Sequence, residues 1–298
     1  MQQTNRSRHR HMTSFQVISL GFLSVILLGS LLLMLPIATK SGQCTSFLDA
    51  LFTSTSAVCV TGLVINDTAT YWSLFGQGII LLLIQIGGMG IITIAIAIAA
   101  ISGRKIGLMQ RSTMQEAISA PTVGGIVRRT QFIIRITILI EIIGAALLAP
   151  VFCRDFGFWK GIWYSLFHSI SAFCNAGFDL IGIRTPFSSL TSYSVQPIVN
   201  LVIMALIVAG GIGFLTWEDI KIHKWHFKKY KMQSKVIFMV TGLLIFLPAL
   251  YFFCFEFSNV PLTERVWVSL FQSVTPRTAG FNTANLTLLS EVGQMLII

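Results

Sequence analysis

The chain has 298 residues, of which 54% are hydrophobic and only 11% are charged, and its mean hydropathy is +0.78. Soluble domains carry roughly 25% charged residues, so this composition excludes a water-soluble globular protein and predicts an integral membrane protein with several spans. The formal net charge is +10, and its distribution along the chain is more informative than its size.

Five apolar runs are long enough, or nearly so, for the roughly 20 residues of a membrane-spanning helix. They show no strand-like alternation of apolar and polar residues, so we expect helices and an all-α polytopic membrane protein. The first run is followed by TKSGQC and not by a small-residue cleavage site, so it is interpreted as a retained span. In chain order the runs are residues 15–35, 74–101, 132–152, 197–215 and 236–255.

Basic residues gather before the first run, between the second and third, and after the fourth. Because Lys and Arg accumulate on the cytoplasmic side of a membrane, these ends and the N-terminus are predicted to be cytoplasmic, in a multi-pass protein of the cell membrane. The flanks of spans account for all three clusters, so nucleic-acid binding is not predicted. The clusters are Arg6, Arg8 and Arg10; Arg104, Lys105, Arg111, Arg128 and Arg129; and Lys221, Lys224, Lys228, Lys229, Lys231 and Lys235.

A short, semi-polar segment recurs between the spans. Residues 52–63 read FTSTSAVCVTGL, residues 167–178 read FHSISAFCNAGF, and residues 271–281 read FQSVTPRTAGF. Each follows a span and a short amphipathic stretch, and the flanking basic clusters place both of its ends on one side. We therefore predict re-entrant helices, whose loops line an aqueous cavity because exposed backbone at membrane depth needs one. Ser46 and Asp49 form a capping pattern that starts the first of these helices.

The loop chemistry favours a monovalent cation. Each loop ends in glycine, which suits a backbone with unusual dihedral angles or a close approach. The side chains are small or neutral, so backbone carbonyl oxygens are the expected ligands, as in a potassium filter. Inward-pointing helix C-termini would add partial negative charge. The five cysteines contain no C-x-x-C pair, so neither a disulfide framework nor a zinc site is predicted.

The segments SAVCVTGL, SAFCNAGF and SVTPRTAGF, together with the glycine clusters QIGGMG and AGGIGF in the second and fourth runs, resemble the pore-forming subunits of the Trk/Ktr/HKT potassium transporter superfamily. The resemblance is closest to the bacterial Ktr or Trk membrane subunit. It implies units of span, pore helix, filter loop and span around one potassium-channel-like pore. It also implies potassium uptake, a homodimer, and a cytosolic ring of nucleotide-binding regulatory subunits. The glycine clusters are expected to let their spans bend or pack closely.

The resemblance divides the chain into three units joined by cytoplasmic segments, with the third unit incomplete. The family has four units, and the sequence stops just as the second span of the third begins, so we expect a fragment of a longer protein. The divisions are 1–14, a basic N-terminus; 15–103, the first unit with pore loop 46–63; 104–131, a cytoplasmic loop; 132–220, the second unit with pore loop 162–178; 221–235, a basic cytoplasmic loop; and 236–298, the third unit with pore loop 264–281.

By the same resemblance, nine residues are expected to form the selectivity filter and four to support it. Potassium at the filter is the only metal ion expected, as substrate; no covalently bound cofactor is expected, and sodium is considered only as a coupling or activating ion. The filter residues are Val60, Thr61, Gly62, Asn175, Ala176, Gly177, Thr278, Ala279 and Gly280, and the supporting residues are Cys59, Cys174, Arg277 and Asp49.

Three alternatives stay open at this point. A sodium-conducting member of the same family is the first, although Gly62 favours potassium because a serine there goes with sodium permeation in the family. A membrane-embedded hydrolase using His168 and Cys174 is the second, but no hydrolase motif is present and we predict no enzyme. The third is a non-conducting assembly subunit.

Two further residues and one segment invite a prediction. Glu141 lies in the middle of the third run, where it either faces a pore or pairs with a polar group on a neighbouring helix. Arg277 is expected to brace the third loop against a carboxylate. Residues 221–235 mix six lysines with aromatic residues, a composition that suits either docking of a cytosolic partner or contact with anionic headgroups.

Overall fold

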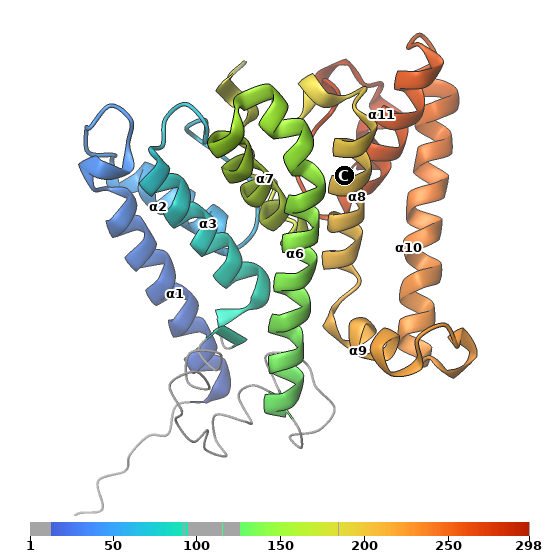
Figure 1. Ribbon diagram of the computed structural model, residues 1–298, viewed down its shortest axis with the longest axis horizontal. Helices are drawn as coiled ribbons and strands as arrows, with labels where there is room; N and C mark the ends of the chain where they lie inside the picture. The colour runs from blue at the N-terminus through green and yellow to red at the C-terminus, as the bar shows by residue number, and fades with distance from the viewer. Residues whose placement is uncertain (1–12, 92, 95–114, 116–125, 184, 298) are drawn as a thin grey trace, which may run out of the picture.

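The computed structural model describes residues 13–91, 93–94, 115, 126–183 and 185–297 (Figure 1). The predicted N-terminal segment 1–14, the predicted loop 104–131 and the end of the second apolar run lie largely outside these residues. Within the described residues every regular element is helical, apart from one isolated bridge between Thr39 and Trp72. The all-α prediction is therefore confirmed.

The described helices are labelled in chain order. They are α1 (Ser14–Leu33), η1 (Pro36–Ala38), α2 (Phe47–Val58), α3 (Leu74–Met89), α6 (Ile126–Phe156), α7 (Phe158–Phe173), η2 (Ile181–Ile183), η3 (Thr191–Tyr193), α8 (Pro197–Gly211), α9 (Phe214–His223), η4 (Phe227–Lys229), α10 (Met232–Tyr251), η5 (Phe252–Glu256), α11 (Leu262–Val274), η6 (Thr275–Arg277), η7 (Leu286–Leu288) and α12 (Glu291–Ile297).

Three of the described helices are long and apolar enough to cross a membrane, and a bent pair, α8 with α9, makes up to four. The three are α1, α6, and α10 continued by η5. Their outward surfaces carry large apolar side chains, for example Leu23, Leu27 and Leu31 on α1. Such surfaces are costly in water and favourable against lipid, as expected for a membrane protein.

Several helices begin at a hydroxyl side chain that caps the first turn. The hydroxyls of Thr13, Ser46 and Ser73 accept hydrogen bonds from the backbone amides three residues further on, at 3.3, 3.1 and 3.2 Å. Each bond satisfies one of the amides that a helix leaves unpaired at its N-terminus. The cap predicted at Ser46 is thus confirmed, and it fixes where the short helix α2 starts.

Each short helix packs beside longer ones. Helix α2 lies against α1 and α3, α7 lies against α6 and α8, and α11 lies against α10 and α8 (Figure 1). The C-terminal halves of α2, α7 and α11 are rich in buried residues, several of them Ser or Thr. Their loops therefore start from inside the protein and not from its lipid-facing surface.

The fourth apolar run differs from its prediction. Residues 197–215 were expected to form one span, but α8 ends at Gly211 and the chain turns by 96° into α9. Gly213 has φ +82° at the start of α9, a value that glycine adopts without strain. The glycine cluster was expected to allow bending, and here it produces a sharp corner.

Candidate functional site

The loops after α2 and α7 share one backbone conformation. Val60 and Asn175 have φ values of 58° and 57°, and Gly62 and Gly177 have φ values of 73° and 71°. In the loop after α11, Gly280 has φ 75°. A positive φ costs little for glycine but is uncommon for other residues. The recurring glycine is therefore required by the backbone of the loop.

Each loop folds back on the end of its own short helix. The amide of the residue before the glycine donates to a carbonyl near the helix C-terminus: Thr61 N to Ser56 O at 2.9 Å, Ala176 N to Ser171 O at 2.7 Å, and Ala279 N to Thr275 O at 2.9 Å. These bonds use carbonyls that a helix end leaves without partners. They hold the glycine at a fixed place relative to the helix.

In two loops, a hydroxyl group near the end of the short helix also binds the residue that follows the loop glycine. Ser171 Oγ donates to the carbonyl oxygen of Phe178 at 2.7 Å, and Thr275 Oγ1 donates to that of Phe281 at 2.6 Å. Both carbonyls directly follow the loop glycine in sequence. The loops are thus closed by side chains buried inside the protein, which limits how far the backbone can relax.

The second loop lies against both the first and the third. A Cβ atom placed on Gly62 would lie 2.6 Å from the carbonyl oxygen of Ala176 and 3.5 Å from Cα of Gly177. A Cβ atom placed on Gly177 would contact the carbonyl oxygen of Ala279 and lie 3.1 Å from Cα of Gly280. Segments more than one hundred residues apart in the sequence are therefore brought to one place through their glycines.

Glycines in the following helices make room for the ends of the short helices. A Cβ atom on Gly87 of α3 would collide with the carbonyl oxygen of Val58, the last residue of α2. A Cβ atom on Gly210 of α8 would collide with the carbonyl oxygen of Phe173, the last residue of α7. The expectation that the glycine clusters allow close packing is confirmed at both positions.

The preceding long helices are fastened to the short ones by a repeated contact. Ser54 Oγ donates to the carbonyl oxygen of Ile26 in α1 at 2.7 Å, and Ser169 Oγ donates to that of Glu141 in α6 at 2.6 Å. The two serines occupy the same place in the aligned segments. Their agreement in the sequence was visible, but their role as donors to another helix was not.

Glu141 is buried and pairs with a polar group on a neighbouring helix. Gln85 Nε2 of α3 donates to both carboxylate oxygens of Glu141, at 2.9 and 3.2 Å, so the pairing alternative is confirmed. The thiol of Cys174 lies 4.0 Å from Gln85 Oε1, and a Cβ atom on Gly88 would touch that sulfur. The pair therefore lies directly behind the loop that follows α7. Sequence reasoning missed Gln85, although a polar residue inside an apolar run was a usable signal.

Arg277 is braced by a hydroxyl group and not by the expected carboxylate. Its Nη2 donates to Thr241 Oγ1 of α10 at 3.0 Å, and its Nη1 is buried without a hydrogen-bond partner among the described residues. Gly211 lies between this guanidinium and the Asn175 amide, since a Cβ there would be 3.9 Å from one and 3.7 Å from the other. The prediction of a carboxylate partner was wrong for the described part of the chain, and Thr241 was not foreseen.

The remaining expected site residues lie at the ends of the short helices. Cys59 and Cys174 are the C-terminal caps of α2 and α7, the first exposed and the second buried. Asp49 lies in the first turn of α2, at the opposite end of that helix from Cys59. Thr61 and Thr278 are exposed, whereas Ala176 and Ala279 are fully buried. Asp49 is thus separated from the loops by the length of α2.

The hydrolase alternative finds no support in the geometry. His168 Nδ1 contacts the carbonyl oxygen of Tyr164 at 2.7 Å, and the Leu180 amide donates to His168 Nε2 at 3.3 Å. Both ring nitrogens are therefore used by the backbone, and neither is left to activate Cys174. Within the described residues no group of three or more His, Cys, Asp or Glu side chains is placed to hold a metal ion. The backbone carbonyls of the loops are candidate cation ligands.

These observations define a class: a multi-pass, all-helical membrane protein in which short helices bring glycine loops together. The sequence model of the TrkH family, described as cation transport proteins, matches residues 1–298. The chain therefore belongs to the TrkH family of cation transport proteins, which confirms the resemblance found in the sequence. It is a member of a transporter family and not an enzyme.

Several known proteins are similar to this chain. It is 41% identical to the potassium/sodium uptake protein NtpJ of Enterococcus hirae over 96% of this chain and 63% of that protein. It is 42% identical to the Ktr system potassium uptake protein B of Bacillus subtilis over 93% of this chain and 62% of that protein. The chain thus spans less than two thirds of the length of these relatives.

A solved structure has the same fold. The crystal structure of the potassium transporter TrkH from Vibrio parahaemolyticus superposes with a TM-score of 0.68 over 99% of this chain and 57% of that one. The sequence identity is 20%, so this likeness establishes the all-helical fold and nothing beyond it.

Proposed function

We propose that the three glycine loops are parts of one selectivity filter and that the chain carries potassium across the cell membrane. Backbone carbonyls of residues 60–62, 175–177 and 278–280 would replace the water shell of the ion, as carbonyl rings do in potassium channels. The observation that carries the proposal is the approach of the loops through their glycines, Gly62 to Ala176 O and Gly177 to Ala279 O.

The short helices support a cation at this place. The C-terminal ends of α2 and α7 run directly into the loops, and a helix C-terminus carries roughly half a negative elementary charge. Each unpaired carbonyl at such an end adds a partial negative charge close to the glycines. The ion itself would be driven by the membrane potential, which contributes about 2.3 kcal/mol per charge per 100 mV.

Potassium is favoured over other cations by three considerations. The names of similar proteins from Enterococcus hirae and Bacillus subtilis both include potassium uptake. Gly62, where a serine would indicate sodium permeation in the resembled family, is a glycine whose space is closed by the Ala176 carbonyl. The described loops also bring no carboxylate to the glycines, which disfavours a divalent ion.

Sodium is the second candidate, because the Enterococcus hirae relative is named a potassium/sodium uptake protein. In this version sodium is either a second substrate or an ion that couples to or activates potassium uptake. Measuring sodium uptake in the wild type and in Gly62→Ser separates a potassium-selective filter from a sodium-conducting one. A potassium-selective filter gains sodium uptake in the variant, whereas a sodium-conducting filter already takes up sodium in the wild type.

The partners and orientation complete the proposal. We propose a homodimer with a cytosolic ring of nucleotide-binding regulatory subunits and a cytoplasmic N-terminus. The description of the Bacillus subtilis relative as part of a Ktr system supports a multi-component assembly, and the basic clusters support the orientation.

The test is rescue of growth at low potassium in a bacterium that lacks its own potassium uptake systems. The protein is expressed from the full gene that contains this sequence, with and without a regulatory subunit. We expect rescue by the wild type, loss of rescue in Gly62→Asp, and retention in Gly42→Asp. Gly42 is the matched control because its φ is +71° and nothing lies within 4 Å of its Cβ position. Equal rescue by both variants would overturn the filter assignment.

A further inference from the structure

The connection between α8 and α10 forms a rigid elbow at the end of the molecule opposite to α11 (Figure 1). Because α9 turns by 96° from α8, and α8 runs alongside the spans α6 and α10, the axis of α9 lies close to the plane of the membrane. We call residues 214–235 the elbow. Its position at the ends of α8 and α10 places it at the level of the lipid headgroups.

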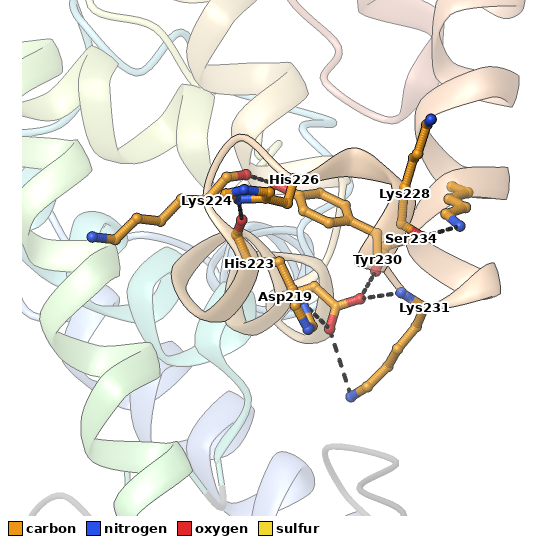
Figure 2. A network of polar contacts seen from close by, with 9 residues as sticks. Asp219, His223, Lys224, His226, Lys228, Tyr230, Lys231 and Ser234 are labelled. Atoms are coloured by element: carbon orange, nitrogen blue, oxygen red, sulfur yellow. Dashed lines mark hydrogen bonds and ion pairs between the residues drawn. The ribbon is translucent and has the colours of Figure 1, made fainter.

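The elbow is held together by one buried carboxylate. Asp219 is 0% exposed and accepts hydrogen bonds from the Lys231 amide at 3.0 Å and from Ser234 Oγ at 2.7 Å. Lys231 Nζ and His223 Nδ1 lie 3.8 and 3.9 Å from its other oxygen (Figure 2). Asp219 therefore joins α9 to the start of α10 and neutralises part of the positive charge there.

Both acidic side chains of the elbow are already paired. Asp219 accepts hydrogen bonds from the Lys231 amide and the Ser234 hydroxyl. Glu218 forms an ion pair with Arg129 of α6, with 3.0 Å between Oε1 and Nε. Among the lysines, Lys235 Nζ donates to the Lys228 carbonyl and Lys221 lies over the Phe132 ring. The elbow thus has no acidic group left to balance its remaining lysines.

Three lysines of the elbow are exposed, and their ammonium groups have no hydrogen bond or ion pair with any described residue. They are Lys224, Lys228 and Lys229. Lys224 ends α9 with φ +47°, a conformation in which glycine is usual, and its carbonyl accepts a bond from the Tyr230 hydroxyl. Figure 2 shows its side chain extending away from the Asp219 network.

An open pocket of about 430 Å³ lies beside Lys224. It is lined by Lys224 and by the apolar and aromatic side chains of Ile220, Trp225, Phe227, Tyr230 and Phe238. Trp225 is 87% exposed and Phe227 is 59% exposed, which is unfavourable for aromatic side chains surrounded only by water. Tryptophan beside lysine is, by contrast, the usual composition of protein surface at the lipid–water interface.

We propose that the elbow binds an anionic phospholipid, with the phosphate beside Lys224, the positive charges of Lys228 and Lys229 adding to the attraction, and the upper part of an acyl chain in the pocket beside Trp225. Charge complementarity selects an anionic headgroup, because three lysines of the elbow are unpaired, one of them lining the pocket, and both acidic residues are paired. The continuity of the elbow with α8 and α10 selects a membrane lipid as the source of the phosphate. The inference rests on the membrane fold and is independent of which ion the protein carries.

The test uses the full protein in detergent, titrated with phosphatidylglycerol, with phosphatidylcholine of the same acyl chains, and with inorganic phosphate. Binding is read from the thermal unfolding midpoint and from quenching of tryptophan by brominated acyl chains. We expect phosphatidylglycerol alone to stabilise the protein. The Lys224→Gln variant should bind it about fivefold more weakly, and Lys224→Gln/Lys228→Gln/Lys229→Gln on the order of a hundredfold more weakly, since a lysine near an anionic surface contributes about a factor of five.

Two matched variants make the result specific. Lys160→Gln removes an exposed lysine near the start of α7 and should leave lipid binding unchanged. Trp225→Phe should remove the part of the tryptophan fluorescence that brominated acyl chains quench. The fluorescence of the other five tryptophans of the chain should remain. Neither variant touches the three loops, so potassium uptake can be measured on the same proteins as a separate readout.

Four results would overturn the proposal. The first two are stabilisation by phosphatidylcholine, or by inorganic phosphate, as large as that by phosphatidylglycerol. The third is unchanged phosphatidylglycerol binding by the triple variant. The fourth is a change in Trp225 fluorescence on adding a regulatory subunit but not on adding lipid. The last result would assign the elbow to a protein partner.

Discussion

Gly62 lies so close to the carbonyl oxygen of Ala176 that a Cβ atom in its place would be 2.6 Å from that oxygen. The contact joins the loop after α2 to the loop after α7, and both loops have the same sequence of positive φ values. Because the oxygen belongs to the backbone of a buried residue, it cannot move away as the end of a flexible side chain would.

The first prediction concerns this contact. Gly62→Ala should strain the two loops by about 1–3 kcal/mol and lower potassium uptake at least about tenfold. Gly42→Ala has nearly the same φ, +71°, with nothing within 4 Å of its Cβ position, and should transport normally. Uptake of a potassium tracer into cells that express each full-length protein measures the difference; equal uptake would show that the contact has no role.

A second prediction compares two glycines of α3. Gly87→Ala should destabilise the protein by about 1–3 kcal/mol, because the added methyl group overpacks against the Val58 carbonyl. Gly78 faces open space on the same helix, so Gly78→Ala should be neutral or stabilising by up to about 1 kcal/mol. Thermal unfolding of the purified proteins compares the two, and a destabilised Gly78→Ala with an unchanged Gly87→Ala would contradict the packing.

The third prediction is a double-mutant cycle on Gln85 and Glu141. Gln85→Leu and Glu141→Leu each leave a buried polar partner unpaired, at a cost of about 1–3 kcal/mol. The double variant removes both polar groups and should be more stable than the sum of the single losses predicts, with a coupling of about 0.5–3 kcal/mol. Additive losses in unfolding experiments would mean that the observed hydrogen bonds, at 2.9 and 3.2 Å, contribute nothing to stability.

The fourth prediction concerns pH and Asp219 in the elbow. Burial raises the pKa of Asp219, but the hydrogen bonds from Ser234 and the Lys231 amide, with the charges of Lys231 and His223, outweigh burial and lower the pKa below its usual value. The folded state therefore binds the proton less tightly than the unfolded state. The stability that this carboxylate contributes is present above the unfolded pKa of about 3.9 and is lost as the pH falls through the lower folded pKa.

Asp219→Asn tests this expectation. The variant should be less stable than the wild type at neutral pH, by about 1–3 kcal/mol, and the gap should narrow as the pH falls below about 4. Glu218→Gln serves as the control, because Glu218 pairs with Arg129 of α6 and not with the Asp219 partners, and this ion pair is partly exposed. The measurement is thermal unfolding as a function of pH; a gap that widens on acidification would show that the pKa is raised and not lowered.

The sequence predicted the spans, the short helices and the glycine loops because these depend on local information. Runs of apolar residues identify spans by length alone, and Ser46 starts α2 through a bond to a residue three positions away. The glycines of the loops could be found because a positive φ restricts the residue type at one position.

The corner after α8 was only half predicted. Its glycines indicated that the span was able to bend, yet the apolar run continues through Gly213 to residue 215 without a change in composition. Hydrophobicity reports whether a segment prefers lipid or protein to water, and it carries no information about direction. The 96° turn depends on how α9 packs and on the Asp219 bonds that tie it to α10.

The sequence by itself thus determined the class of protein, the helical kind of its local elements, and the loop positions where the backbone needs glycine. Only the tertiary structure decided that Gln85 is the partner of Glu141 and that a hydroxyl, Thr241, and no carboxylate, braces Arg277. The partners in these pairs lie 56 and 36 residues apart. A polar side chain shows in the sequence that it needs a partner, but which group meets that need depends on which helices come to lie side by side.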